Sequence, residues 1–200
     1  MRLHSRIFFF SHYQSSGWKF LVFFIVCTVL LSACHPTIRA RRLGDASIQR
    51  NQIGMDYGRT GHCQEAIKEF DEALLLINKA QAVCSPPQCV IEDQNIINDL
   101  KAEIYYNRAY SYLMLNPRQP QNIDRAIDDA RAAIRFSMLA HPQATYTLGY
   151  ACLLKGDAAC AREQLYQLKT RFPQGREDLT KELSKKLESE YEQRFGAPPK

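Results

Sequence analysis

The sequence has few of the patterns that β-strands require, because alternating apolar and polar runs between glycine-rich turns are scarce. This shortage argues against a β-sandwich or a β-barrel. Apolar residues recur instead at intervals of three and four, the spacing of an amphipathic helix. Roughly 165 residues follow the first 33, which is enough for one domain. We therefore expect an all-α fold.

Recognisable catalytic motifs are also missing. The sequence contains no GxSxG motif, no HExxH motif and no phosphate-binding glycine loop. Beyond residue 35 the only histidines are His62 and His141, and acidic neighbours such as Asp128 and Asp129 are typical of a solvated helix face. Zinc needs converging Cys and His pairs, and beyond residue 35 His62 with Cys63 is the only adjacent one. We expect a protein that is not an enzyme and uses no metal and no cofactor.

The first 33 residues lack aspartate and glutamate, and their only formal charges are Arg2, Arg6 and Lys19. Residues 20–33 then form an almost entirely apolar run of about 14 residues, which suits a signal peptide and is shorter than the ~20 needed to span a bilayer as a helix. Removing these three positive charges lowers the formal net charge from +5 to +2. The basic balance therefore gives no support for a nucleic-acid partner.

The apolar run ends in Leu31-Ser32-Ala33-Cys34, with the small residues Ser32 and Ala33 directly before the cysteine. This tetrapeptide resembles the lipobox of bacterial lipoproteins. The resemblance implies a signal peptide over residues 1–33 and a diacylglycerol on Cys34, usually with an acylated amine, and two or more acyl chains anchor a protein stably. The alternatives are an ordinary cleaved signal and an uncleaved anchor. His35 stands where aspartate favours inner-membrane retention, so we expect a lipid anchor in the outer membrane, facing the periplasm.

Residues 34–46 are expected to form the lipidated N-terminus and a tether. Three arginines in this segment, Arg39, Arg41 and Arg42, lie close enough to the anchor to contact anionic headgroups. A solvated tether without such contacts is the alternative.

The next part of the chain contains three pairs of expected helices with a shared pattern of small and large residues. The pattern runs Gly54, Tyr57, Gly61, Ala66, Phe70 in the first pair, Ala109, Tyr112, Ala126, Ala130 in the second, and Gly149, Cys152, Gly156, Ala161, Leu165 in the third. It resembles the tetratricopeptide repeat, a helix–turn–helix unit of about 34 residues. The resemblance implies about three helical hairpins over residues 47–175 in a short right-handed solenoid. Tyr57, Phe70 and Leu165 would fill the space around the small residues.

The second pair departs from this pattern, because residues 117–122 lengthen its turn. We expect Asn122 or Asp124 to cap the helix over 123–136. The preceding helix is expected to begin near Asp93. Its apolar stripe consists of Ile96, Leu100 and Ile104.

Residues 176–200 are expected to form a C-terminal helix and tail. Their apolar residues are spaced by four: Leu179, Leu183, Leu187, Tyr191 and Phe195. One narrow apolar stripe with a solvated back suits the capping helix that a repeat stack needs at its end. A partner-binding helix is the alternative.

Four cysteines are candidates for disulfides in an oxidising periplasm. Cys84 and Cys89 bracket a Pro-Pro loop, and Cys152 and Cys160 lie four residues to either side of Gly156. Two small buried thiols are the alternative for the second pair. Cys63 is a poor partner for the first pair, because a continuous helix of about 20 residues would span roughly 30 Å.

In tetratricopeptide proteins the first helices of the hairpins line a concave groove that holds a partner. The resemblance places these residues in the groove: Asn51, Met55, Tyr106, Asn107, Tyr110, Tyr146, Thr147 and Tyr150. Tyrosine offers broad contact area and a hydroxyl group. We expect a scaffold that recruits another envelope protein, as in pilus, secretion or outer-membrane assembly. The alternatives are an accessory or regulatory subunit of a cell-wall-acting enzyme, and a spacer whose tyrosines pack between repeats.

Overall fold

The computed structural model describes residues 21–23, 25, 36–84, 91–115, 119–137, 141–172 and 177–196. Within these ranges the regular structure is α-helical, as the sequence predicts, and includes the helices α2 (Pro36–Arg59), α3 (Cys63–Val83), α4 (Ile91–Leu115), α5 (Pro120–Phe136), α6 (Pro142–Lys155), α7 (Ala158–Thr170) and α8 (Glu177–Phe195). None of the helices in the described ranges is both long enough and apolar enough to cross a membrane. Cys34, Cys89 and most of residues 1–33 lie outside the described residues.

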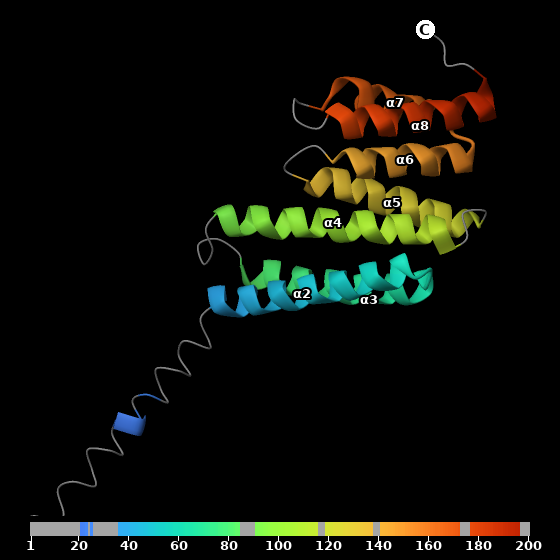
Figure 1. Cartoon of the computed structure of the whole chain (residues 1–200). Coiled ribbons are helices and arrows are strands. Elements are labelled where there is room, and N and C mark those ends of the chain that lie inside the picture. Colours follow the sequence, from blue (N-terminus) through green and yellow to red (C-terminus); the bar gives the residue numbers. More distant parts are fainter. Residues whose placement is uncertain are drawn as a thin grey trace, which may run out of the picture.

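The helices pack as consecutive hairpins. α2 pairs with α3, α4 with α5, and α6 with α7, while α8 lies against both α6 and α7. Figure 1 shows the pairs stacked in one direction, from α2 and α3 to α7 and α8. Neighbouring hairpins contact each other through α3 with α4 and through α5 with α6, and their first helices also touch. This packing is consistent with a helical solenoid.

Two glycines form the tight turns that the sequence predicts. Gly61 follows α2 with a φ of +81°, and Gly156 follows α6 with a φ of +86°. Only glycine adopts this left-handed backbone without a steric penalty. After the second turn, the Asp157 side chain accepts a hydrogen bond from the backbone N–H of Cys160 at 3.0 Å and caps α7.

Close approach within the first hairpin depends on Gly54. A Cβ atom on this residue would lie 2.5 Å from Cε1 of Phe70, so the phenyl ring occupies the space that glycine leaves. Phe70 is 1% exposed, and Leu165 is buried in the third hairpin. Tyr57, by contrast, is 39% exposed. The prediction that Tyr57 fills the interhelical space is therefore wrong, because the ring of Phe70 already fills it.

The segment expected to be a tether is mostly helix. Since α2 begins at Pro36, residues 36–46 belong to it. Ala40 is buried in the same cluster as Phe70, and Leu43 packs against that cluster. Burial of these apolar side chains stabilises the helix, and proline is well suited to a first helical position. The predicted tether is thus wrong over residues 36–46.

The α4–α5 hairpin corrects two further predictions. Ile97 is buried and Ile96 is 65% exposed, so the apolar stripe of α4 passes through Ile97 and not through Ile96. α5 begins at Pro120, three residues earlier than expected. Asn122 is therefore inside the first turn, where it donates a hydrogen bond to Gln119, and Asp124 pairs with Lys155 at 2.7 Å. Neither residue caps the helix.

One predicted cysteine pair is disulfide-bonded, and so is one member of the other. Cys152 and Cys160 are joined across the α6–α7 hairpin, with their Cα atoms 5.8 Å apart. Cys84 is also disulfide-bonded, while its predicted partner, Cys89, lies outside the described residues. Cys63 is a buried free thiol.

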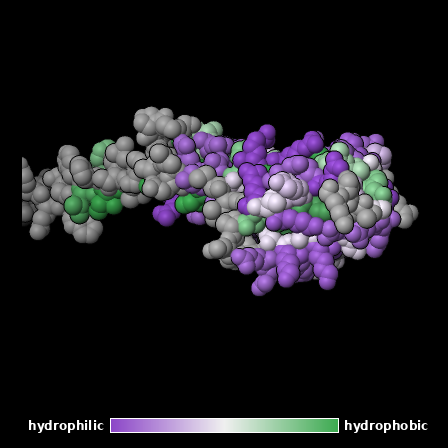
Figure 2. Space-filling model, turned by 90° about the horizontal axis from the view of Figure 1, so that it is seen from above, coloured by the Kyte–Doolittle hydropathy of each residue, from purple (hydrophilic) through white to green (hydrophobic). Residues whose placement is uncertain are grey.

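The last helix covers α6 and α7 with one face. Leu187 and Tyr191 are buried, and Thr180 and Ser184 share this buried face. Phe195, at the end of the predicted stripe, is 39% exposed. Figure 2 looks at the molecule from above, that is, from the α7 and α8 end, and shows a mainly hydrophilic surface with small hydrophobic patches.

Candidate functional site

Three of the predicted groove tyrosines meet in one small cavity between α4, α6 and α8. The cavity has a volume of about 130 Å³. We call it the aromatic pocket, and its lining residues are Tyr110, Leu113, Met114, Tyr146, Thr147, Tyr150, Lys186 and Glu190. The helices place these residues together because side chains four apart lie on the same face of a helix. This rule applies to Tyr110 with Met114, Tyr146 with Tyr150, and Lys186 with Glu190.

The rings of Tyr146 and Tyr150 form a stacked pair on α6. Their centroids are 6.2 Å apart and their planes differ by 3°. The Lys186 Nζ lies 5.4 Å from the centroid of the Tyr146 ring, within the range of a cation–π contact. On the α4 side, Tyr110 is 47% exposed and Met114 is 50% exposed. A partner can therefore reach apolar surface here without any rearrangement of the helices.

The electrostatics of the pocket favour a neutral tyrosine beside two opposite charges. Burial raises the pKa of Tyr146 to about 12, and the negative charge of Glu190 adds to this shift. The Tyr146 hydroxyl therefore stays protonated at neutral pH and can both donate and accept hydrogen bonds. Lys186 and Glu190 add one positive and one negative charge to the same wall.

Tyr106 lies beside the pocket and does not line it. Its ring centroid is 5.1 Å from that of His141, and burial raises the pKa of Tyr106. His141 in turn accepts a hydrogen bond through Nδ1 from the backbone N–H of Ala144 at 3.2 Å and caps α6. Tyr106 is thus part of the packing between α4 and the start of α6.

Two other predicted groove residues connect α2 to α4. Asn107 donates a hydrogen bond to Oδ1 of Asn51 at 3.1 Å, and Asn51 donates one to Oε1 of Glu103 at 3.2 Å. Asn51 is 4% exposed, and the sulfur of the half-buried Met55 lies 3.9 Å from its amide nitrogen. Predicted as a groove residue, Asn51 is instead buried, and both ends of its amide are used between helices.

Thr147 lines the pocket but is only 2% exposed. Its hydroxyl donates a hydrogen bond to the backbone carbonyl of Gln143 at 2.9 Å. The side chain is therefore part of the pocket floor, and its hydroxyl is bonded within α6.

Sequence reasoning missed the other lining residues of the pocket, which are Leu113, Met114, Lys186 and Glu190. Met114 was detectable, because it follows the predicted groove residue Tyr110 by four positions on one helix. Lys186 and Glu190 flank the buried Leu187 with the spacing of one helical turn, yet only the docking of α8 on α6 brings them to the tyrosines. α8 was expected to be a cap or a partner-binding helix, and it also forms a wall of the pocket.

A charged cluster elsewhere has a structural role. Arg108 donates two hydrogen bonds to the carboxylate of Asp129, both at 2.7 Å, and a third to Asp71. Burial raises the pKa of Asp129, and Arg108 acts against this increase. The three residues join α4, α5 and α3, and the paired charges compensate one another.

The described residues contain no group of three or more His, Cys, Asp or Glu side chains that could hold a metal ion. No family model matches the chain, and no curated protein matches it. The function must therefore be inferred from the residues of the chain itself.

Proposed function

We propose that the chain is a membrane-anchored lipoprotein of helical repeats that holds a segment of another envelope protein in the aromatic pocket. Leu31-Ser32-Ala33-Cys34 supports the lipid anchor through its likeness to a lipobox. The stacked hairpins support an interpretation as tetratricopeptide-like units of a right-handed solenoid, with α8 as the cap. The role is that of a scaffold, without catalysis of its own.

The aromatic pocket is the observation on which this proposal depends. Tyrosine and methionine are enriched at protein interfaces, and methionine adapts its shape to different partners. A volume of about 130 Å³ is smaller than the ~300–1,000 Å³ of typical small-molecule sites. It suits one or two apolar side chains of a partner segment, inserted beside Tyr110 and Tyr146. Lys186 and Glu190 would then orient that segment by pairing with its charged groups.

Photocrosslinking in intact cells tests the pocket. We expect a photoreactive residue in place of Tyr110 or Tyr150 in the full chain to capture a discrete envelope protein, which mass spectrometry can identify. The matched control is Tyr166 on α7, which is also a tyrosine, is 61% exposed and does not line the pocket. If position 166 captures the same protein with equal yield, the pocket is not the binding site.

Replacement of the lipidated cysteine tests the anchor separately. We expect Cys34→Ser to move the protein from the membrane fraction to the soluble fraction, because it removes the atom to which the lipid is attached. Its helical circular dichroism should stay unchanged, since the packed helices begin at Pro36. Capture from position 110 should fall, because the local concentration near the partner is lost. Retention in the membrane would contradict lipid anchoring and favour an uncleaved apolar segment.

A further inference from the structure

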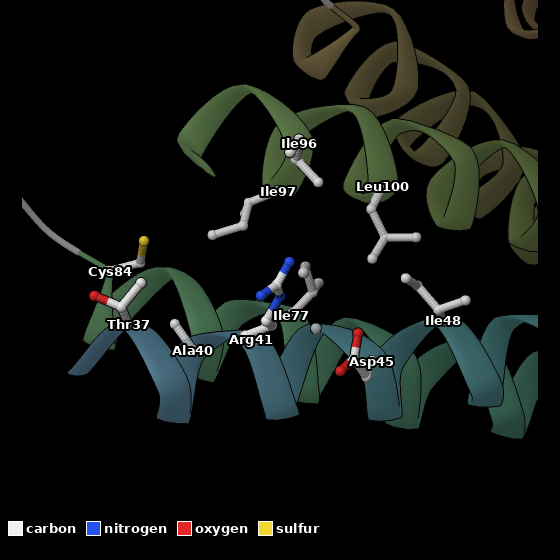
Figure 3. A pocket seen from close by; sticks show the side chains of 11 residues that line it. Thr37, Ala40, Arg41, Asp45, Ile48, Ile77, Cys84, Ile96, Ile97 and Leu100 are labelled. Carbon is white, nitrogen blue, oxygen red and sulfur yellow. The ribbon is translucent and has the colours of Figure 1, made fainter. Parts of the chain in front are cut away.

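A second and larger cavity opens at the other end of the stack. It has a volume of about 350 Å³ and lies between the first half of α2, the end of α3 and the first half of α4. We call it the N-terminal groove. Figure 3 shows Leu100 on α4 facing Ile48 on α2 across this space, Ile97 on α4 extending toward the Cys84 side, and the guanidinium of Arg41 reaching into it from α2.

The N-terminal groove is mainly apolar space that the described side chains leave unfilled, and its charged lining residues are Arg41 and Asp45, both on α2. On its rim Ile48 is 51% exposed and Ile96 is 65% exposed. A Cβ atom added to Gly44, which also lines the groove, would meet no atom within 4 Å. Exposed apolar surface of this kind is unfavourable in water and indicates a binding site when it is concentrated in one place.

The groove begins close to the proposed lipidation site. Thr37, at its N-terminal end, is three residues after Cys34, so the two Cα atoms are at most about 11 Å apart. From Thr37 to Ile48 the groove follows 11 residues of α2, or about 16 Å of helix. One acyl chain has a similar length, since it spans half of the ~30 Å hydrocarbon core of a bilayer.

Volume and polarity agree with one acyl chain. If a methylene group takes ~30 Å³, the share of a water molecule in the liquid, the cavity holds on the order of ten such groups, enough for most of one chain but not for two. Arg41 stands one helical turn after Thr37, near the point where the chain would enter. Its guanidinium can donate hydrogen bonds to the ester or amide carbonyl at the head of the acyl group.

We propose that the N-terminal groove holds one acyl chain of lipidated Cys34 whenever that chain lies outside a bilayer. The inference rests on the proposed lipidation. It goes beyond the scaffold function, because it gives the protein an intramolecular binding site for its own acyl chain. Binding there removes the apolar rim of the groove and the acyl chain from water together.

Photocrosslinking after removal of detergent tests this inference on the full chain, produced with its N-terminal segment and purified from membranes. A diazirine residue at Leu100 should form an adduct that joins the peptide containing residue 100 to the lipid-bearing peptide that begins at Cys34. The same residue at Tyr166 should form none. Gly44→Phe should abolish the adduct by filling the groove, while Gly44→Ala, the matched control, should retain it.

A second variant, Ile96→Asp, tests the groove independently in case Gly44→Phe does not fold. Ile96→Asp places a charge on the groove rim at a site that is 65% exposed, and we expect it to reduce the adduct while circular dichroism stays unchanged. A lipid mass on Cys34 with equal yields from positions 100 and 166 would overturn the inference and leave the scaffold proposal intact. An adduct to a free phospholipid would also overturn it. Absence of lipid mass on Cys34 would overturn the anchor together with the inference.

Discussion

The two ends of the helix stack differ in how the first helix of the terminal hairpin is covered. At the C-terminal end, α8 lies on α6, and Leu187 is fully buried against Gly149, whose missing side chain makes room for it. At the N-terminal end, α2 and α4 leave the N-terminal groove between them, and Gly44 faces open space. Gly149 thus allows close packing because the large side chain of Leu187 lies opposite it. Gly44 leaves open space because no side chain lies opposite it.

Leu187→Ala should have the largest effect, because it removes the side chain that closes the C-terminal end. We expect a loss of about 2–5 kcal/mol in the free energy of unfolding, from lost burial and the cavity left behind. Ile96→Ala, on the open groove, should change it by less than about 0.5 kcal/mol, as surface substitutions usually do. Urea unfolding followed by circular dichroism measures both. Equal effects would mean that the two ends are packed alike.

The same contrast separates what the sequence could predict from what it could not. The helices, the turns at Gly61 and Gly156 and the cysteine pair of the last hairpin follow from local patterns, because each depends on spacing within one hairpin. Ile96 and Ile97 are adjacent and equally apolar, so the choice of which one faces the core depends on how α4 is rotated against α3. Spacing alone does not determine that rotation.

The candidate site divides in the same way. Tyr110, Tyr146 and Tyr150 were predicted because a repeat pattern assigns positions on first helices. Asn51 was assigned by the same mapping, but its burial depends on Glu103 and Asn107 of another hairpin. The N-terminal groove was not predicted, because residues 36–46 were expected to be a tether and not the first three turns of a helix.

Two glycines of the same helix should respond in opposite directions to one substitution. Gly54→Ala places a Cβ atom 2.5 Å from the ring of Phe70, which is rigid and fully packed. We expect a net loss of about 1–2 kcal/mol, since overpacking exceeds the gain in helix propensity. Gly44→Ala meets no atom and should stabilise the protein by about 0.5–1 kcal/mol. Changes of the same sign in urea unfolding would show that α2 packs differently from this structure.

Alkaline titration should give the smallest effect and should distinguish the aromatic pocket from open surface. The pKa of Tyr146 is about 12 in the folded protein, mainly because of burial, and its ordinary value is 10. Because the folded value is the higher one, the contribution of neutral Tyr146 to stability is complete below pH 10 and is lost as the pH rises through about 12. Burial also raises the pKa of Tyr106 and Tyr112, so ultraviolet titration of tyrosinate should show a late part that Tyr146→Phe reduces by one tyrosine. Glu190→Gln should move the contribution of Tyr146 to lower pH, since it removes the second cause of the shift. An unchanged late part of the titration in Tyr146→Phe would mean that α8 does not enclose this ring.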